Sequence, residues 1–498
     1  MTHTLYALLL ILLVGSELAA QNTEWSLAFG DAGDQAARGL YELENGDVLV
    51  LVGELPNPQV LNYQAYFYLL DEAGQLRESH RLAHFTSQNP QHLLARNDDS
   101  FVVGGAAIQF SGNEFPYLME VDRRGNARWM MFADSLFAAH NLYAGQVKDI
   151  DPLPNGGYLV TGLGIELGFP SVQHDCLIRV GPTGEAEAMW VGTVGAGAFP
   201  EASTVLSDST ALLIGNAADQ EGEERYGYIS RVNIYTGERQ QKRYTTSEGS
   251  YRFWDIDRDE MGATLVSGVH YRTEQTAGIL TLKVNEDLEG AVPNTRALTN
   301  WSVAVGSDLL PLPNGEWLLA GTASGGLPPE ARTNEGIIAT APASGEITFL
   351  ETFAEDNTQG SYLSGAIPGR DRDYILACGT SLHWSDPNRN NEAWVLKIAC
   401  RTGETVAFDE DPGIGLYPNP TTRFLNLNLT ELESCLSPFA DIDIRVFDGL
   451  SREIDVPFVV TQHGLRLNLE KIGAGNYFVQ VLLDGRIQQA LKFTKISN

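Results

Sequence analysis

The feature that most constrains the fold is a repeat that runs through most of this 498-residue chain. Each copy has an apolar stretch, a tight turn and a second apolar stretch ending in glycine, as in "DIDPLPNGGYLVTG" (149–162) and "DLLPLPNGEWLLAG" (308–321). These closing glycines recur roughly every 54 residues. They are Gly53, Gly104, Gly162, Gly215, Gly268, Gly321 and Gly379. Such a period predicts one supersecondary unit per repeat.

A second figure follows the first in each repeat, for example "YLMEVDRRGN" (117–126) and "CLIRVGPTGE" (176–185). Its turn glycines keep step with the first set, and another short strand-like stretch comes after it. We therefore predict that each repeat forms four antiparallel strands in meander order, with glycine where the hairpin turns need a positive φ. Seven such units predict an all-β fold, a seven-bladed β-propeller.

The two ends of the repeat region predict how the ring closes. The seventh repeat ends thinly at "ETVAFDED" (404–411), whereas "TEWSLAF" (23–29) has the pattern of a fourth strand. We expect residues 23–29 to supply the outer strand of the last blade, which would remove a free sheet edge.

The N-terminal segment indicates export. An apolar run from Leu5 to Val14 precedes small residues that end at Ala19 and Ala20. This order and length predict a signal peptide at 1–20, although no Lys or Arg precedes the apolar run. No later stretch is long and apolar enough to span a bilayer, so we expect an exported protein without a transmembrane segment.

Charge separates the tail from the rest of the chain. The formal net charge is -31, which argues against nucleic acid as a partner. Residues 421–498 hold eight basic and nine acidic residues, so they carry only -1 of this charge. We therefore predict a propeller at 21–408, a linker at 409–415 and a separate C-terminal domain at 416–498.

The tail is predicted to be a small immunoglobulin-like β-sandwich. Stretches such as "FLNLNL" (424–429) and "IDIRVF" (442–447) alternate apolar and polar residues, as half-buried strands do. Turn sequences separate about seven short strands of this kind. "YPNP" (417–420) marks the entry to the domain, since its two prolines suit neither a helix nor a central strand.

In several ordered elements the tail resembles the type A C-terminal sorting domain of the type IX secretion system of Bacteroidetes. The matching residues are Tyr417, Pro418, Asn419, Pro420, Asp448, Gly449, Gly475, Tyr477, Lys492 and Lys495. A Cys-containing segment, "TELESCLSPFAD" (430–441), and the turn sequence "DGLSREI" (448–454) depart from the family pattern. The resemblance implies type IX secretion machinery as a partner, passage across the outer membrane, and a released or surface-attached product.

The repeats also loosely resemble quinoprotein-like propellers of secreted bacterial proteins, through "VDRRGNARW" (121–129) and "GPTGEAEAMW" (181–190). Because those propellers have more blades and shorter repeats, the likeness covers blade construction alone. It implies no quinone site.

A binding site is expected on the rim that carries the long, variable loops, because variable loops on a rigid ring are the usual place for recognition. Aromatic, basic and acidic residues of these loops suit a protein or glycan surface. The candidates are His140, Tyr143, Phe199, Glu201, Tyr251, Arg252, Trp254, Trp301, Tyr362, His383 and Trp384. Each of these residues has a competing interpretation as packing between blades.

The sequence contains no recognisable catalytic motif. It has no HExxH, no GxSxG and no Cys pair at metal-ligand spacing, so no catalytic residue and no metal site are predicted. "DIDRDEMG" (255–262) has alternate carboxylates like a calcium loop, but it falls on an expected strand and turn and lacks the closing Glu. Calcium is therefore considered but unsupported. A Cys378–Cys400 disulfide is open.

Taken together, the sequence favours an exported, surface-attached or secreted propeller that binds a protein or glycan without chemistry. A secreted polysaccharide hydrolase or lyase with its site at the loop-rich mouth is the alternative. A structural or adhesive role is a third reading. The ligand and the oligomeric state stay open.

Overall fold

The computed structural model describes residues 23–30, 33–56, 62–82, 84–108, 113–168, 172–192, 196–218, 225–247, 249–273, 276–288, 293–297, 301–312, 315–325, 333–342, 344–347, 349–353, 360–370, 374–382, 390–399, 415–417, 421–428, 442–448, 452–454, 456–461, 464–483 and 486–496. These residues form two compact units, one mainly within 23–398 and one mainly within 415–496. The predicted signal peptide at 1–20, and residues 409–414 of the predicted linker, lie outside the described residues. The domain boundaries stay predictions.

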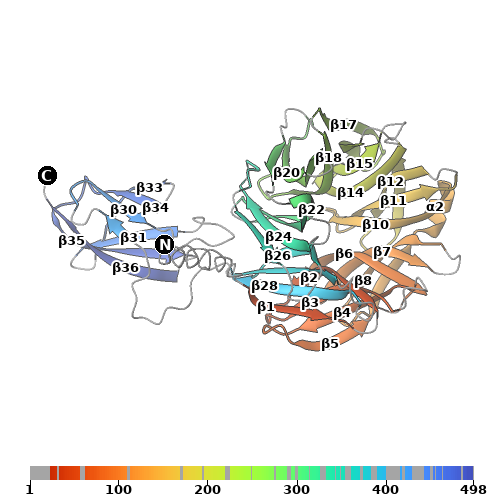
Figure 1. The fold of residues 1–498 in the computed structure, drawn as a ribbon, viewed down its shortest axis with the longest axis horizontal. Helices are drawn as coiled ribbons and strands as arrows, with labels where there is room; N and C mark the ends of the chain where they lie inside the picture. The colour runs from red at the N-terminus through yellow and green to blue at the C-terminus, as the bar shows by residue number, and fades with distance from the viewer. Residues whose placement is uncertain are drawn as a thin grey trace, which may run out of the picture. The chain divides into compact units, whose positions relative to one another are not determined.

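The first unit is a seven-bladed β-propeller, as the repeat predicted. Each blade has four antiparallel strands, and Figure 1 shows the blades arranged in a ring. Short pairings between blades join blades 4 and 5, and blades 6 and 7, into continuous eight-stranded sheets. Blade 1 is β2 (Asp34–Glu42), β3 (Val48–Leu55), β4 (Gln64–Leu70) and β5 (Leu76–Arg81). Blade 2 is β6 (Ser87–Asn97), β7 (Ser100–Ile108), β8 (Phe115–Val121) and β9 (Ala127–Phe132). Blade 3 is β10 (Leu142–Pro152), β11 (Tyr158–Glu166), β12 (Val172–Val180) and β13 (Ala186–Gly192).

The remaining blades repeat this order. Blade 4 is β14 (Ala196–Ser207), β15 (Thr210–Ala218), β16 (Arg225–Asn233) and β17 (Arg239–Thr246). Blade 5 is β18 (Gly249–Arg258), β19 (Thr264–Thr273), β20 (Thr276–Val284) and β21 (Asn294–Ala297). Blade 6 is β22 (Trp301–Pro311), β23 (Trp317–Gly325), β24 (Thr333–Ala341) and β25 (Phe349–Phe353). Blade 7 is β26 (Gly360–Pro368), β27 (Tyr374–Leu382), β28 (Glu392–Ala399) and β1 (Thr23–Phe29).

The N-terminal strand β1 closes the ring, which confirms the closure predicted from the sequence. It pairs antiparallel with β28, from Thr23 opposite Ile398 to Phe29 opposite Ala393. The indole of Trp394 donates a hydrogen bond of 2.8 Å to Ser26 Oγ. Blade 7 is therefore built from both ends of the propeller sequence, and β1 covers the outer edge of β28.

Burial along the strands explains why the sequence pattern is strong in the middle of each blade. Strands β3, β7 and β8 are almost wholly buried, whereas the fourth strand β5 is mostly exposed. A strand covered by blades on both faces reads as a continuous apolar run, while an edge strand in water reads as polar. The repeated apolar runs are thus the second and third strands of the blades.

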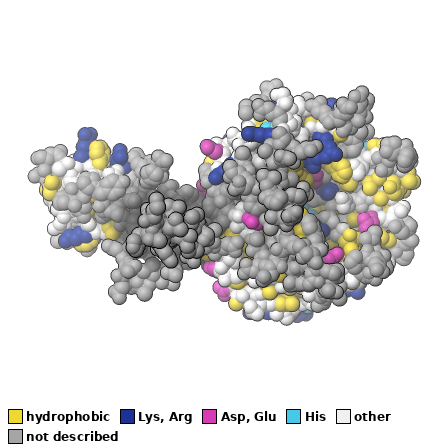
Figure 2. All heavy atoms as spheres, in the orientation of Figure 1, with side chains coloured by type: hydrophobic (Ala, Val, Ile, Leu, Met, Phe, Trp, Pro, Cys, Tyr) yellow, Lys and Arg dark blue, Asp and Glu magenta, His cyan; other side chains and the backbone are white. Residues whose placement is uncertain are grey.

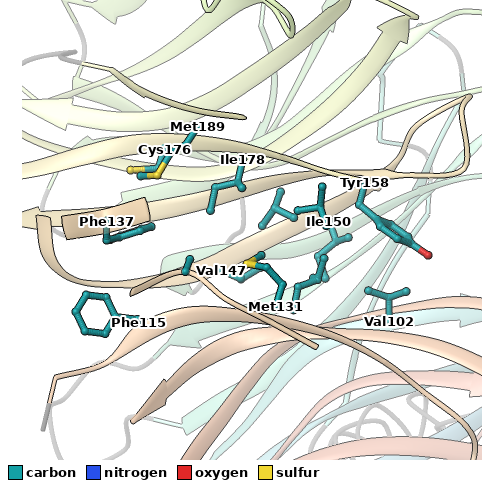
Figure 3. Packing of buried hydrophobic residues seen from close by; sticks show 14 of the residues in the cluster. Val102, Phe115, Met131, Phe137, Val147, Ile150, Tyr158, Cys176, Ile178 and Met189 are labelled. Carbon is teal, nitrogen blue, oxygen red and sulfur yellow. The ribbon is translucent and has the colours of Figure 1, made fainter. Parts of the chain in front are cut away.

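The core of the propeller lies between neighbouring blades. Figure 3 shows one such cluster, in which Val102 and Phe115 of blade 2 lie opposite Val147, Tyr158 and Ile178 of blade 3. The short helix α2 (Asp134–Ala139) connects these blades and adds Phe137 to the same cluster. Burial of these side chains is the main favourable term that holds the blades together.

The second unit is a β-sandwich of two four-stranded sheets. One sheet has the order β29 (Gly415–Tyr417), β30 (Phe424–Asn428), β34 (Gly464–Asn468) and β33 (Phe458–Thr461). The other has the order β32 (Glu453–Ile454), β31 (Ile442–Asp448), β35 (Gly475–Leu483) and β36 (Arg486–Lys495). Alternate residues of both sheets meet in one core, which includes Leu425, Leu467, Val446, Val479 and Phe493. This is the sandwich that the alternating tail sequence predicted.

The cysteines do not cross-link the described part of the chain. Cys176 and Cys378 are buried free thiols, and Cys400, the other half of the disulfide considered above, lies outside the described residues. Burial raises the pKa of both thiols, which makes them poor nucleophiles.

Candidate functional site

The first strand of every blade contains a β-bulge at the same place in the repeat. The extra residues are Arg38, Gln91, Lys148, Glu201, Trp254, Ser307 and Ser364. First strands from all seven blades line one cavity of about 470 Å³, which we call the central channel. Because a bulge re-aims the side chains beside it, these positions determine what the channel presents.

Three aspartates that directly follow a bulge connect consecutive blades. Asp149 Oδ2 accepts a hydrogen bond of 2.8 Å from the backbone N–H of Ser203. Asp255 Oδ2 accepts one of 2.7 Å from Leu309 N–H, and Asp308 Oδ2 accepts one of 3.0 Å from Ala366 N–H. The same repeat position thus performs the same blade-to-blade contact in blades 3, 5 and 6.

The channel is strongly acidic on the side of blades 3 to 6. Its lining carboxylates are Asp149, Asp151, Glu201, Asp255, Asp257 and Asp308. Burial raises the pKa of Glu201 to about 7 and that of Asp257 to about 7. Burial and like-charged neighbours also raise the pKa of Asp151 and Asp255, and burial raises that of Asp308. Three basic residues also line the channel: Arg38, His92 and Lys148.

A second cavity, of about 450 Å³, opens beside the channel and is called here the mouth cavity. It is lined by the start of β2 and by the ends of β3 and β27, next to the variable loops of the rim. Its lining residues are Asp34, Gln35, Ala36, Arg38, Gly53, Leu55, Tyr63, Asn89, Thr322, Tyr362, Leu363, Ser364, Thr380, Leu382 and Asn391. Arg38 and Ser364 line both cavities, so the mouth cavity and the channel adjoin there.

The mouth cavity contains polar groups that the fold leaves unsatisfied. Gln35 is 1% exposed, and neither its Oε1 nor its Nε2 has a hydrogen-bond partner among the described residues. Asn89 Oδ1 and Arg38 Nε are buried in the same state. A buried polar group without a partner costs about 1–3 kcal/mol, so three in one cavity indicate a ligand or solvent that completes them.

Three residues proposed from the sequence lie at these cavities. Glu201 and Trp254 line the central channel, and Tyr362 lines the mouth cavity. Glu201 accepts a hydrogen bond of 3.1 Å from Asn216 Nδ2, and the Tyr362 hydroxyl accepts one of 2.8 Å from Asn334 Nδ2.

Four other proposed residues take part in local packing or lie at the surface. The ring of Tyr251 lies 4.7 Å from that of His270, and Arg252 lies over Tyr271 at 5.0 Å. His140 is exposed at the end of α2, and Tyr143 is half-buried on β10.

The last four candidates are Phe199, Trp301, His383 and Trp384. Phe199 is 39% exposed on β14. Trp301 begins β22. His383 and Trp384 lie outside the described residues.

Sequence reasoning missed Gln35, Arg38, Asn89 and the aspartates of the channel. A signal for the aspartates was present, because "DIDPLPN", "DLLPLPN" and "DIDRDEM" begin with Asp at one repeat position. No comparable signal marks Gln35, whose importance comes from its burial beside a cavity.

The segment "DIDRDEMG" forms a strand and a turn. Asp255 and Asp257 belong to β18, and Asp259 Oδ1 accepts the N–H of Ala263 at 2.7 Å to close the hairpin. Within the described ranges, no group of three or more His, Cys, Asp or Glu residues is arranged to hold a metal ion.

Two of the sorting-motif residues that the structure describes, Asp448 and Tyr477, make contacts within the sandwich. Asp448 Oδ1 accepts the N–H of Arg452 at 3.0 Å, closing a turn after β31. Tyr477 stacks on Phe493 at 5.4 Å and donates a hydrogen bond of 2.9 Å to Gly473 O. Tyr417 lies on β29, Gly475 starts β35, and Lys492 and Lys495 lie on β36. Pro418, Asn419, Pro420 and Gly449 fall outside the described residues.

Comparison with known families identifies the second unit. The model described as "Secretion system C-terminal sorting domain" matches residues 415–494. The C-terminal unit is a sorting domain. This confirms the resemblance found at about 414–498 and marks the chain for export to the cell surface or beyond. Among the residues that the structure describes, no helix has the length and apolar character to span a membrane.

No curated sequence matches the chain. Solved structures of low sequence identity do match it, and three of them follow. A protein of unknown function from Dyadobacter fermentans is 10% identical, with a TM-score of 0.45, covering 76% of this chain and 98% of that one. An ulvan lyase, titled a new family of polysaccharide lyase, is 10% identical with a TM-score of 0.46, covering 75% and 96%. Drosophila semaphorin 1b is 8% identical with a TM-score of 0.41, covering 76% and 87%.

Proposed function

We propose that the propeller is a non-catalytic binding module for an extracellular glycan, held at the mouth cavity. The observation that carries this proposal is the set of unsatisfied polar groups at Gln35, Arg38 and Asn89. Sugars present many hydroxyl groups, each of which donates and accepts hydrogen bonds, so they match amide and guanidinium groups in a cavity. Figure 2 shows apolar, basic and acidic side chains interspersed on the described surface of one face.

The route to the cell surface forms part of the same proposal. The predicted signal peptide would carry the chain into the periplasm of a Bacteroidetes cell, where it is removed. The sorting domain would then engage the type IX secretion machinery for passage across the outer membrane. The product would be released or attached to the surface.

The experiment is a glycan array probed with the mature chain and its Gln35→Leu variant. Leucine has a similar volume and needs no hydrogen bond, so the unliganded variant should be as stable as the native chain or more so. Binding should weaken roughly tenfold or more, because the sugar loses hydrogen-bond partners in a buried site. If the native chain binds no glycan, or if the variant binds equally well, the proposal is wrong. A protein ligand captured at the same cavity would also contradict it.

The alternative is a polysaccharide hydrolase or lyase, and the channel carboxylates favour it. Glu201 and Asp257 have pKa values of about 7 in a cavity, a state suited to general acid–base work at neutral pH. A polysaccharide-degradation screen distinguishes the two functions. Turnover that disappears in Glu201→Gln would replace the binding-only proposal with an enzyme.

A further inference from the structure

The mouth cavity has an asymmetric set of charges. Among its described lining residues, Arg38 is the one cation and Asp34 the one carboxylate. Asp34 Oδ1 already accepts the backbone N–H of Asn391 at 2.9 Å, a contact that fixes β2 to the start of β28. No ion pair joins Arg38 to a carboxylate in the described part of the chain. Among the described residues, the cavity therefore presents a guanidinium that forms no ion pair, although Asp34 lines the same cavity.

A guanidinium with an unpaired buried donor lowers the stability of the fold, and its N–H groups point in fixed directions. Burial lowers the pKa of Arg38, and its buried Nε lacks a hydrogen-bond partner. A guanidinium presents a planar fork of N–H donors that matches a carboxylate or sulfate in a bidentate pair. An anion that enters the cavity would satisfy both the charge and the unpaired donor. A neutral sugar would satisfy the donor alone.

The surrounding groups describe the rest of the ligand. The Gln35 amide offers two donors and an acceptor, and Asn89 Oδ1 offers an acceptor. Neutral amides of this kind suit hydroxyl groups rather than a second charge. The volume of about 450 Å³ lies within the usual range of small-molecule sites.

The central channel limits how deep an anion can enter. The channel adjoins the mouth cavity at Arg38 and Ser364, and its lining includes six carboxylates together with His92 and Lys148. Those of the carboxylates that are ionised oppose an anion beyond Arg38, and this opposition grows as the pH rises above about 7, the pKa at which Glu201 and Asp257 lose their protons. An anionic group should therefore stop at the guanidinium, with its hydroxyl groups directed to Gln35 and Asn89.

We propose that the mouth cavity binds a sugar residue that carries one monovalent anionic group, a carboxylate or a sulfate ester, paired with Arg38. The inference rests on the proposed glycan binding and adds the chemical class of the ligand. The two anions share their chemistry at a guanidinium, so separate arms of the experiment distinguish them.

The experiment compares three matched probes on the mature chain by titration calorimetry, after a glycan array has identified the backbone sugar. The probes are oligosaccharides of that sugar in neutral, carboxylated and sulfated forms. We expect one of the anionic forms to bind at least about tenfold more tightly than the neutral form, as a charge-assisted pair requires. Equal affinity for neutral and anionic forms overturns the inference but leaves the proposed function intact. An array with no binding overturns both.

Variants assign the effect to Arg38. Arg38→Gln should reduce the affinity for the anionic probe about tenfold or more and leave the neutral probe nearly unchanged. Arg38→Lys keeps the charge without the planar fork of donors, so its affinity for the anionic probe should lie between those of the native chain and Arg38→Gln. This variant replaces Arg38→Gln in the test if a thermal melt shows that Arg38→Gln folds poorly. Arg123→Gln removes an exposed charge from the β8–β9 turn and is the matched control. Anionic binding that survives both Arg38 substitutions contradicts the inference.

Discussion

Single residues explain how a repeated sequence forms a ring with a distinctive interior. The aspartate after the bulge connects one blade to the next in blades 3, 5 and 6, while blade 4 has Ala202 there and blade 7 has Gly365. The carboxylates consequently gather on one side of the channel. Their crowding in a buried place raises the pKa of several of them.

Glu201 should make stability depend on pH. The pKa of Glu201 in the folded protein, about 7, exceeds its ordinary value because burial favours the protonated carboxyl. The folded protein is therefore most stable, as far as Glu201 is concerned, below about pH 4, and it loses this contribution as the pH rises to about 7. Above pH 7, Glu201→Gln should be more stable than the native chain by about 2–3 kcal/mol, and at pH 4 the difference should vanish. Denaturant unfolding across this pH range measures it. The control Glu238→Gln, exposed in the same blade, should follow the native curve, and a Glu201→Gln variant that keeps the native pH dependence would contradict the assignment.

A tryptophan from one blade packs on a turn glycine of the next blade. Trp25, Trp129 and Trp190 lie against Gly74, Gly184 and Gly237, and a Cβ on any of these glycines would overlap the indole. All three glycines have positive φ, the left-handed region that other residues enter at a cost. These contacts fix the outer strands of neighbouring blades to one another.

Gly237→Ala should therefore destabilise the propeller by more than a backbone effect alone. Gly156→Ala is the matched control, since Gly156 also has positive φ (84°) but its Cβ would meet nothing nearer than Pro182 at 3.8 Å. We expect about 1 kcal/mol for the control and roughly 1–3 kcal/mol more for Gly237→Ala, from thermal or urea unfolding. In a Trp190→Ala background the two glycine substitutions should cost the same. If the two substitutions lower the free energy of unfolding equally in the native background, the Trp190 indole moves aside without cost and the expectation is wrong.

At the scale of elements, the short strand β1 contacts two blades. It completes blade 7 against β28, and Lys397 Nζ forms an ion pair of 2.9 Å with Glu24. The indole of Trp25 also donates a hydrogen bond of 3.1 Å to Glu72 O in blade 1. This strand thus joins the last blade to the first.

Deleting residues 21–32 should abolish cooperative unfolding of the propeller, because blade 7 would lose its outer strand and its contact with blade 1. Circular dichroism and calorimetry measure the transition. Adding a synthetic peptide of residues 21–32 should restore part of it. A melting curve unchanged by the deletion would contradict the role assigned to β1.

At the scale of the whole molecule, the chain combines a propeller with a sorting domain that has a hydrophobic core of its own. Leu425, Leu467, Val479 and Phe493 are almost fully buried within that second unit. A compact core of this kind is what a separable domain requires.

Residues 405–498 fused behind an exported reporter should direct it to the cell surface in a host with a type IX secretion system. Protease accessibility of the reporter on intact cells measures this. A fusion that ends at residue 484 lacks β36, which pairs with β35, and should stay in the periplasm. A full-length fusion retained in the periplasm would contradict the transport role.

Much of the fold could be predicted because it depends on periodic features. Apolar runs, turn glycines and their spacing specify blades, and the fourth-strand pattern of residues 23–29 specified the closure. The sorting domain was predictable because its motif residues occur in a fixed order.

The candidate site could be predicted only in part. Glu201, Trp254 and Tyr362 were proposed as residues of variable loops, but they lie inside the first strands β14, β18 and β26 and line the cavities from there. Gln35 and Arg38 are three positions apart, a spacing that places side chains on opposite faces of a regular strand. The bulge at Arg38 breaks that alternation, and both residues line the mouth cavity.

The sequence by itself therefore determined the number and kind of units in this protein, and where one of them sends it. Periodicity and local motifs are properties of neighbouring residues, so they can be read along the chain. Only the tertiary structure decided which side chains meet in the central channel and the mouth cavity. Closing seven repeats into a ring brings together groups hundreds of residues apart, such as Gln35 and Tyr362, and places Arg38 in the mouth cavity without an ion pair among the described residues.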